Sequence, residues 1–349
     1  MENKHLERNL TLQDVARQAG VSVSTASRAL NDRPTIKAET RERVVAAAKA
    51  LNYRHASRRR AQMSARTDSP FAILKAIALV ASGFNNPYYN HLVLGIEDEA
   101  NHENVNLVLM TIRHDPLREQ RAIQRLTATP LEGAILLNAC LSVDTILDIQ
   151  AQRELPMVVF HYAVEHPRVA CISTETQAAG HRAAAYLISL GHRRIAWLGQ
   201  KNLTSVARQR GVEQAVAEAG EQVDPLLVFN RDFSEQNAGM RAMEEVFASG
   251  PLPTGVIAFN DLMAYGAMHA IHNRGLNIPD DISVIGFDNV PSSEHTTPPL
   301  TTLALPTYQM GQWAMRLLRR IQAGENMCEA EGITLPTPLV VRESTGPCK

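Results

Sequence analysis

The chain has 349 residues, of which 45% are hydrophobic and 20% charged, and its formal net charge is -1. This length and apolar content exclude a disordered chain and allow two or three domains. The charge is uneven, because residues 1–66 hold 14 Lys and Arg against 6 Asp and Glu, whereas the remainder holds 21 against 30. A basic head on an acidic body predicts a module that binds a polyanion, and the head lacks the broad apolar face that membrane binding needs.

The cysteines and the N-terminus indicate a reduced, cytoplasmic protein without membrane contact. The four cysteines lie far apart and form no CxxC pair, so neither a zinc module nor a disulfide framework is expected. They are Cys140, Cys171, Cys328 and Cys348. The segment MENKHLERN lacks the apolar stretch of a signal peptide, and no apolar run approaches the length of a membrane span. We expect no cofactor and no metal site.

The stretch LTLQDVARQAGVSVSTASRALN near the N-terminus predicts two short helices joined by a sharp turn. Thr11 can cap a first helix over residues 12–19, which Gly20 then ends. Ser22 can cap a second helix over 23–30. Helices joined by so short a turn form a helix-turn-helix, whose second helix enters the major groove of DNA. An αα-hairpin inside an ordinary helical domain is the alternative interpretation.

The second of these helices is small and polar, which suits a helix that must approach base edges closely. Its outward residues, predicted to face the bases, are Val23, Ser24 and Arg28. Its inward face needs only Ala26, Ala29 and Leu30. A third helix over 37–51 completes the head, with one apolar face formed by Val44, Val45, Ala48 and Leu51.

The rest of the chain predicts a linker and two α/β halves. Residues 54–70 nearly lack bulky apolar side chains, which is typical of a linker. Beyond them, short Val-, Ile- and Leu-rich strands alternate with amphipathic helices, the pattern of a parallel sheet covered on both faces. The predicted strands lie at 77–82, 106–111, 133–138 and 156–161, and again at 194–199, 226–230, 255–260 and 282–288. Two such halves predict a ligand-binding cleft at the carboxyl ends of their strands.

Polar and aromatic residues gather at these strand ends. They are Tyr88, Tyr89, His161, Tyr162, Asn260, Asp261 and Asp288. Any one of them is more often a helix cap or a structural polar group than a ligand contact. Together, carboxylates and an amide that bind hydroxyl groups, and aromatic rings that stack on a ligand ring, indicate a sugar or base site.

Seven segments of the chain closely resemble the LacI/GalR (lactose repressor) family of bacterial transcriptional regulators, over nearly the full length. They are TLQDVARQAGVSVSTASRALN, TRERVVAAAKALNY, GHRRIAWLG, ARQRG, PTGVIAFNDLMAYGAM, GLNIPDDISVIGFDN and PPLTTLALP. The resemblance implies a helix-turn-helix head, a hinge, and an α/β body like a periplasmic binding protein, with two doubly wound parallel-sheet subdomains. It also implies a homodimer on palindromic double-stranded operator DNA, and a small effector that changes operator affinity.

The resemblance also implies how the chain is divided. A DNA-binding domain would span 1–54, a basic hinge 55–72, and an effector-binding and dimerisation domain 73–349. Within the last, the N-subdomain would hold 73–174 and 305–334, and the C-subdomain 175–303 and 335–349. Crossings between the subdomains are expected near 173–175, 300–305 and 332–336.

Carried over residue by residue, the resemblance makes Val23 and Ser24 the readers of the major groove. Contacts to the DNA backbone or to neighbouring bases are implied for Thr11, Thr25, Ser27, Arg28 and Asn31. In the body, effector contacts are implied for Arg208, Asp261 and Asp288. Aromatic positions of the pocket are implied for Tyr88, Tyr89, Tyr162 and Phe233.

The hinge departs from the family pattern. Gln62 stands where a leucine usually wedges into the minor groove, and it follows Arg58, Arg59 and Arg60. Arginines gain from the negative potential of a narrow minor groove, so we expect binding that bends DNA less and relies more on charge. A one-residue shift would offer Met63 as the wedge, and a solvated linker is a third interpretation.

The ligand pocket departs from the family as well. His161 stands where aspartate is common, which removes a negative charge, and Arg208 offers a fork that suits a carboxylate. These two residues favour an acidic sugar. Asp261 and Asp288 favour a neutral polyol instead, so we expect a sugar or a sugar acid.

Two other classes of function fit less well. A transport receptor would need an export signal and has no use for a basic head. An enzyme would need a nucleophile beside a base, or a paired acid and base, and the chain has no GxSxG, HExxH, Walker A or GxGxxG motif. We therefore expect a transcriptional repressor and not an enzyme. A dimer is expected rather than a tetramer, because no heptad repeat follows the last strand-like segment.

Overall fold

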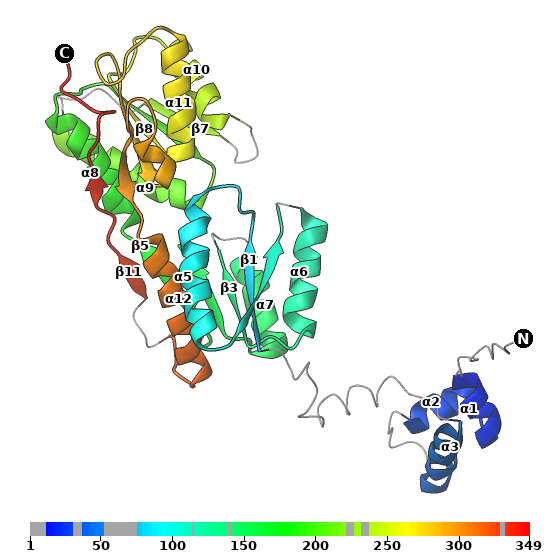
Figure 1. Cartoon of the computed structure of the whole chain (residues 1–349). Helices are drawn as coiled ribbons and strands as arrows, with labels where there is room; N and C mark the ends of the chain where they lie inside the picture. Colours follow the sequence, from blue (N-terminus) through cyan, green and yellow to red (C-terminus); the bar gives the residue numbers. More distant parts are fainter. Residues whose placement is uncertain are drawn as a thin grey trace, which may run out of the picture. The chain divides into compact units, whose positions relative to one another are not determined.

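The computed structural model describes residues 12–30, 37–51, 75–113, 115–137, 141–220, 227–231, 237–328 and 332–349. The chain forms two compact units, one within residues 1–74 and one spanning 75–349. The first unit is helical, and the second contains two β-sheets with helices around them (Figure 1). No helix in the described ranges is long and apolar enough to cross a membrane.

Three helices form the first unit and pack around a core of alanines and valines. They are α1 (Leu12–Ala19), α2 (Val23–Leu30) and α3 (Ala38–Ala50). The buried core consists of Val15, Ala16, Ala19, Ala26, Ala29, Val44, Ala47 and Ala48. Such small side chains let the helices approach closely. The predicted helix-turn-helix and its third helix are confirmed.

The turn between α1 and α2 follows from two residues. Gly20 ends α1 with a φ of +64°, which is strained for residues that carry a side chain. The Ser22 hydroxyl accepts a hydrogen bond of 3.1 Å from the Thr25 backbone N–H and so caps α2. Arg43 of α3 donates to the Ala19 carbonyl at 3.1 Å, which ties the third helix to the end of the first.

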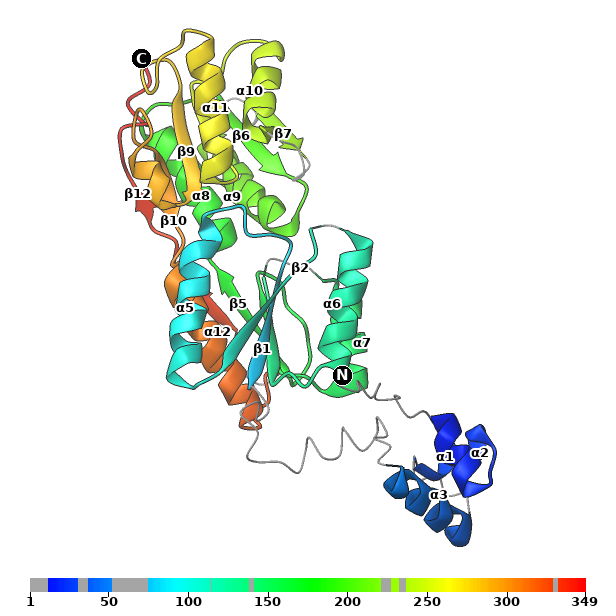
Figure 2. The same cartoon turned by 45° about the vertical axis from the view of Figure 1, so that its right-hand side comes forward.

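Two six-stranded sheets form the core of the second unit (Figures 1 and 2). The first has the order β11-β5-β4-β3-β1-β2, with β1 (Ala76–Ala81), β2 (Asn106–Thr111), β3 (Gly133–Leu136), β4 (Met157–Phe160), β5 (Val169–Thr174) and β11 (Ile333–Leu335). The second has the order β12-β10-β9-β8-β6-β7, with β6 (Ile195–Gln200), β7 (Leu227–Arg231), β8 (Gly255–Ala258), β9 (Ser283–Asp288), β10 (Thr301–Ala304) and β12 (Leu339–Val340). Neighbouring strands are parallel, apart from β10 and β12.

Helices cover the two faces of the first sheet and pack in pairs around the second. The first sheet has α5 (Tyr88–His102) and α12 (Thr307–Gln322) on one face, and α6 (Pro116–Ala128) and α7 (Val143–Arg153) on the other (Figure 2). In the second half, α8 (Thr176–Ser189) packs against α9 (Leu203–Ala219), and α10 (Ala238–Ala248) against α11 (Asp261–Asn273).

Strand β1 shows why the strands are continuous apolar runs. Ile77 and Leu79 join the core next to α5 and α12, whereas Ala78 and Val80 join the core next to α6 and α7. All four are fully buried, because a parallel sheet between two helical layers offers no face to water. The predicted doubly wound α/β body is confirmed.

The chain passes between the two sheets three times, after β5, after β10 and between β11 and β12. Each passage lies within a few residues of an expected crossing. The sequence pattern predicted β1 to β4 and β6 to β9. It missed β5, β10 and β11, all of which lie next to a crossing, whereas β12 lies within the strand-like segment expected near the end of the chain, at 337–344.

Three helix pairs of the body touch backbone to backbone at paired glycines. In each pair both helices carry one, and a Cβ on either would overlap the partner's backbone. The pairs are Gly95 of α5 with Gly311 of α12, Gly180 of α8 with Gly211 of α9, and Gly239 of α10 with Gly266 of α11. The backbone that Gly180 touches is the carbonyl of Arg208, so this contact sets the position of that arginine.

Gly180→Ala should destabilise the body, because the new methyl group would overlap the Arg208 carbonyl and push α8 away from α9. Overpacking of this kind costs about 1–3 kcal/mol of the free energy of unfolding. Urea unfolding followed by circular dichroism measures the loss. Gly83→Ala is the control, since a Cβ at Gly83 meets nothing within 4 Å. Equal unfolding midpoints for the two variants would contradict the close helix contact.

Candidate functional site

The predicted DNA-reading residues lie on or around α2. Val23 begins that helix and is 43% exposed, so its side chain is accessible to another molecule. Thr25 is half-buried, and its hydroxyl lies 2.8 Å from that of Ser22. Ser24, Ser27 and Arg28 also belong to α2. Predicted site residues outside the described ranges are Thr11, Asn31, Arg58, Arg59, Arg60 and Phe233.

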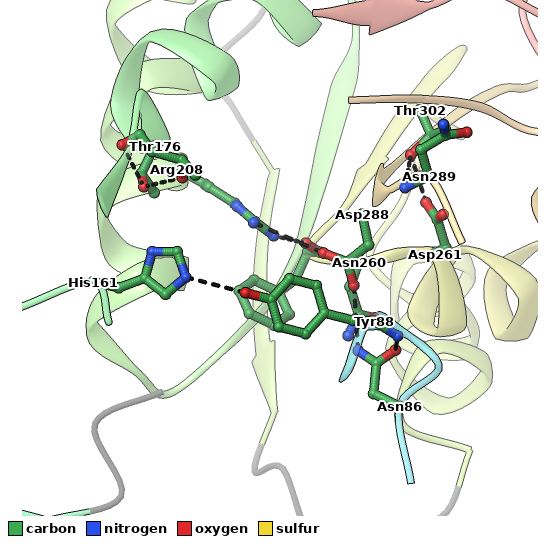
Figure 3. Close-up of polar contacts among 12 residues, drawn as sticks. Asn86, Tyr88, His161, Thr176, Arg208, Asn260, Asp261, Asp288, Asn289 and Thr302 are labelled. Carbon is green, nitrogen blue, oxygen red and sulfur yellow. Dashed lines mark hydrogen bonds and ion pairs between the residues drawn. The ribbon is translucent and has the colours of Figure 1, made fainter. Parts of the chain in front are cut away.

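Five residues from both halves of the body come together where strands of the two sheets end (Figure 3). Asn86 and Tyr88 follow β1, His161 follows β4, Arg208 lies in α9, and Asp288 ends β9. We call these five residues the junction site. Tyr88, Arg208 and Asp288 are only 5%, 4% and 8% exposed. The expected meeting of strand ends is therefore present, with the two halves in direct contact.

Arg208 is a buried cation held against two aromatic rings. Its guanidinium carbon lies 4.3 Å from the ring centre of Phe287 and 5.0 Å from that of Phe259. Its Nη1 donates to the Phe259 carbonyl at 2.5 Å, and its Nη2 lies 3.9 Å from Asp288 Oδ1. Its Nε is buried and makes no hydrogen bond within the described ranges. Burial lowers the pKa of this guanidinium, and the charge of Asp288 opposes that shift.

The sequence pattern missed three residues of this arrangement, Asn86, Phe259 and Phe287. The phenylalanines stand directly before Asn260 and Asp288, at the ends of the adjacent strands β8 and β9. Two aromatic residues at adjacent strand ends were the available signal, because parallel strand ends lie side by side. Asn86 lies in the run GFNNPYY, where asparagine is typical of a turn.

A hydrogen bond joins the two halves across the junction site. Asn86 Nδ2 donates to Asp288 Oδ2 at 3.2 Å. Asn86 Oδ1 accepts from the Tyr88 backbone N–H at 2.9 Å, which turns the amide nitrogen toward the carboxylate. Asp288 therefore contacts Asn86 from the first half and Arg208 from its own half.

His161 and Tyr88 face each other on the other side of the site (Figure 3). The Tyr88 hydroxyl lies 3.4 Å from His161 Nε2, and His161 adopts a φ of +68°. The imidazole is partly exposed, but its Nδ1 is buried and has no hydrogen-bond partner among the described residues. Burial, and then the charge of Arg208, lowers the pKa of His161 to about 4, so the ring is neutral at pH 7. Burial raises the pKa of Tyr88 well above its ordinary value, so the phenol keeps its proton.

Asp288 is the group of the junction site that titrates near neutral pH. Burial raises its pKa to about 7, the charge of Arg208 opposes this rise, and nearby Asp261 adds to it. The Asn86 amide also favours the ionised form by donating to it. Burial therefore outweighs the attraction between Asp288 and Arg208, as is common for buried ion pairs.

Asp261 and Asn260, two of the predicted effector contacts, use their side-chain oxygens to hold the chain behind the site. Asp261 is fully buried, and its Oδ2 accepts from the Val290 N–H at 2.9 Å and the Ser293 hydroxyl at 2.5 Å. Its Oδ1 accepts from the Thr302 hydroxyl at 2.6 Å, toward which the carboxylate points in Figure 3. The Asn260 side chain caps α11. These oxygens are satisfied inside the protein, so a ligand would have to break those bonds to reach them.

The remaining predicted aromatic residues lie around the site. Tyr89 is buried and packs edge-on against Tyr88 and Phe84, at ring-centre distances of 5.2 Å and 5.6 Å. Tyr162 packs into the core next to α6 and α7, and its hydroxyl donates to the Leu141 carbonyl at 3.3 Å. Tyr89 therefore supports Tyr88 from behind, whereas Tyr162 packs on the other face of the sheet.

A groove along α8, which also includes Gln214 of α9 and Leu339 of β12, is a second place where a molecule could bind. Its lining includes His181 and Arg182, which are engaged with protein groups. His181 Nε2 lies 2.7 Å from Glu218 Oε2, and Arg182 donates to the Thr337 carbonyl at 2.6 Å. The junction site is the stronger candidate, because it buries two polar atoms without partners in the described part of the chain.

Two protein families match separate parts of the chain. Residues 11–55, which contain the helix-turn-helix, match the family of bacterial regulatory proteins called the lacI family. Residues 184–345, which contain all six strands of the second sheet, match the periplasmic binding protein-like domain.

Individual proteins match over nearly the whole chain. The HTH-type transcriptional regulator DegA of Bacillus subtilis (strain 168) is 32% identical over 346 residues, which cover 97% of this chain and 98% of DegA. The solved complex of the transcriptional regulator CelR with cellobiose is 29% identical, has a TM-score of 0.69, and covers 96% of this chain and 99% of its own. The lac repressor dimer bound to operator and the anti-inducer ONPF is 27% identical, has a TM-score of 0.68, and covers 97% and 100%.

A helix-turn-helix head on a body built like a periplasmic binding protein defines a class of ligand-responsive DNA-binding proteins. The chain belongs to the lacI family of bacterial regulatory proteins, as its motifs predicted. It is a DNA-binding transcriptional regulator and not an enzyme.

Asp288→Asn should increase the stability of the body, compared with the unsubstituted protein, more at high pH than at low pH. A carboxyl whose pKa is raised by folding binds its proton more tightly in the folded protein than in the unfolded chain. Its contribution to the free energy of unfolding is therefore lost as the pH rises from about 4 to about 7. The asparagine variant lacks this loss. Its Tm relative to the unsubstituted protein should be higher at pH 8 than at pH 5, as measured by scanning calorimetry.

Asp148→Asn, at an exposed carboxylate of α7, is the matched control for this measurement. It should change the Tm by the same amount at both pH values. If Asp288→Asn also gave the same change at both, the Asp288 carboxyl would not have a raised pKa in the folded protein.

Proposed function

We propose that this chain is a cytoplasmic, dimeric repressor whose affinity for palindromic operator DNA is controlled by a small effector at the junction site. The observation that carries this proposal is the direct contact of the two halves through Asn86 and Asp288, next to the buried Arg208. A ligand that competes with Asn86 for Asp288 must change the contact between the halves. Its differential affinity for the two resulting arrangements then shifts their populations.

The assignment of functions to segments of the chain is part of the same proposal. We assign DNA binding to residues 1–54, a basic hinge to 55–72, and effector binding and dimerisation to 73–349. The exposure of Val23 at the start of α2 supports its role, with Ser24, in reading the major groove. A head with an excess of basic residues favours contacts to phosphates.

The effector we propose is a polyhydroxylated molecule, a sugar or a sugar acid. A carboxylate that accepts, next to a guanidinium that donates, suits adjacent hydroxyl groups, which do both. The complex of the similar protein CelR with cellobiose supports this class. Direct contacts are assigned to Tyr88, His161, Arg208 and Asp288. Asp261, Asn260 and Tyr89 hold these residues in place.

Dimerisation is proposed because two heads must be held one helical turn of DNA apart to read a palindrome. The similar lac repressor binds its operator as a dimer.

Arg208→Lys should weaken the response to effector and leave operator binding intact. Lysine cannot donate as a planar fork, and hydrogen bonds to charged groups contribute about 1.5–3 kcal/mol, so the effector concentration needed for half-maximal response should rise at least about tenfold. Fluorescence anisotropy measures this on DNA selected from random sequences. The titrant is the sugar or sugar acid that raises the protein's Tm most in a screen.

Arg210→Lys is the control, because Arg210 lies on the exposed side of the same helix. It should respond to effector like the unsubstituted protein. A normal effector response in Arg208→Lys would remove Arg208 from the site, and loss of operator binding would give it a role in DNA affinity.

Replacing Arg58, Arg59 and Arg60 together by Ala should lower the salt dependence of operator binding. Each phosphate contact adds about 0.9 to the slope of log affinity against log salt, so the slope should fall by roughly two to three. Met63→Ala should leave DNA bending nearly unchanged, as measured by energy transfer between the DNA ends. The three exposed arginines of α6, which are Arg118, Arg121 and Arg125, give a charge-matched control that should keep the slope. An unaltered slope in the hinge variant would rule out the proposed arginine contacts.

A further inference from the structure

Arg208 carries a buried guanidinium that is incompletely satisfied by the protein. Its side chain is 4% exposed, and Nε makes no hydrogen bond within the described ranges. Asp288 does not fill this place, because its Oδ1 lies 3.9 Å from Nη2, which is longer than a hydrogen bond. Its Oδ2 accepts from Asn86. A guanidinium with an unoccupied edge points to a ligand that offers a matching pair of acceptor oxygens.

The surrounding charges narrow the class of ligand. The charged and titratable groups that face Asp288 are Arg208 of α9, Tyr88 of α5, and Asp261 and Tyr265 of α11. The neutral ring of His161 brings no negative charge to the other side of Arg208. When Asp288 is protonated, Arg208 is a cation without a counter-charge in direct contact. When Asp288 is ionised, a second carboxylate at Arg208 would meet a like charge.

We propose that the junction site takes a sugar acid, whose carboxylate binds the open edge of the Arg208 guanidinium, and that Asp288 takes up a proton as this ligand binds. This inference rests on the proposed function, since it names the chemical class and the proton balance of the same effector site. One proton enters with one carboxylate, so the net charge of the site does not change. The ligand's hydroxyl groups can pair with His161 Nδ1 in either tautomer, because a hydroxyl both donates and accepts.

The proposal has a pH signature that a neutral sugar does not share. Only the protein with protonated Asp288 accepts the acid, and the pKa of Asp288 in the empty site is about 7. Affinity for the acid should therefore fall about tenfold between pH 6 and pH 8. Binding should take up nearly one proton per site at pH 8 and little at pH 6. A neutral sugar that donates to Asp288 would bind the ionised form, so its affinity would not fall with rising pH.

Isothermal titration calorimetry of the full chain tests this with three sugar acids and three neutral sugars. D-gluconate, D-glucuronate and D-galacturonate are compared with D-glucose, D-galactose and cellobiose. Each titration is run at pH 6 and pH 8 in two buffers that differ in ionisation enthalpy, which gives the number of protons taken up. We expect at least one acid to bind more tightly than every neutral sugar at pH 6, with the proton uptake and the tenfold loss described.

Two variants separate the roles of the carboxylate and the imidazole. Asp288→Asn should keep acid binding at pH 6, remove the proton uptake and bring the affinity at pH 8 up to that at pH 6. His161→Asp should weaken binding of the acid at least about tenfold more than it weakens binding of a neutral sugar, because it adds a like charge. Asp148→Asn, at an exposed carboxylate of α7, should keep the pH dependence of the unsubstituted protein. An acid affinity in Asp288→Asn that still falls with pH would overturn the assignment of the proton to Asp288.

The outcomes distinguish this inference from the proposed function. The inference is wrong if a neutral sugar binds the protein and makes it release operator DNA while the acids do not bind. It is also wrong if an acid binds without proton uptake at pH 8. In both cases the effector site stands. If none of the six ligands binds or changes operator affinity, the inference fails together with the proposed class of effector.

Discussion

The burial of the Arg208 guanidinium is the constraint on which the rest of the body depends. Taking a cation out of water costs several kcal/mol even after the surrounding protein has relaxed, roughly as for other buried ions. Here the cost is offset by the rings of Phe259 and Phe287, by the Phe259 carbonyl and by the nearby carboxylate of Asp288. All of these groups lie at the ends of β8 and β9, so the cation is accommodated where those strand ends meet α9.

The same arginine links helix packing to the contact between the halves. Gly180 lies against the carbonyl of Arg208, so the α8–α9 contact places the guanidinium at the strand ends. Asp288 lies between this cation and Asn86 of the other half, and it is the one group there with a pKa near neutrality. A change of charge or of ligand at Asp288 therefore acts on both the buried cation and the bond that joins the halves. This coupling is what a regulator needs between an effector and its own conformation.

Small residues allow close helix packing in both units. In the head, alanines let three short helices close around one another, so that α2 needs little bulk on its buried face. In the body, paired glycines bring helices into backbone contact, and one of these contacts is with the carbonyl of Arg208. Close packing fixes these positions, because a packed interior resists continuous deformation.

The sequence by itself determined those helices and strands that depend on residues close together in the chain. The bounds of α1 and α2 follow from Gly20 and Ser22, and eight strands follow from apolar runs, because caps and periodicity act between near neighbours in the chain. Only the tertiary structure decided which strand-end residues form the site. Asp261 and Asp288 end similar apolar runs, yet Asp261 is held by Thr302 and Ser293 while Asp288 meets Arg208 and Asn86. Those partners lie far away in the sequence, and no local pattern records whether a buried carboxylate will find a hydroxyl or a cation.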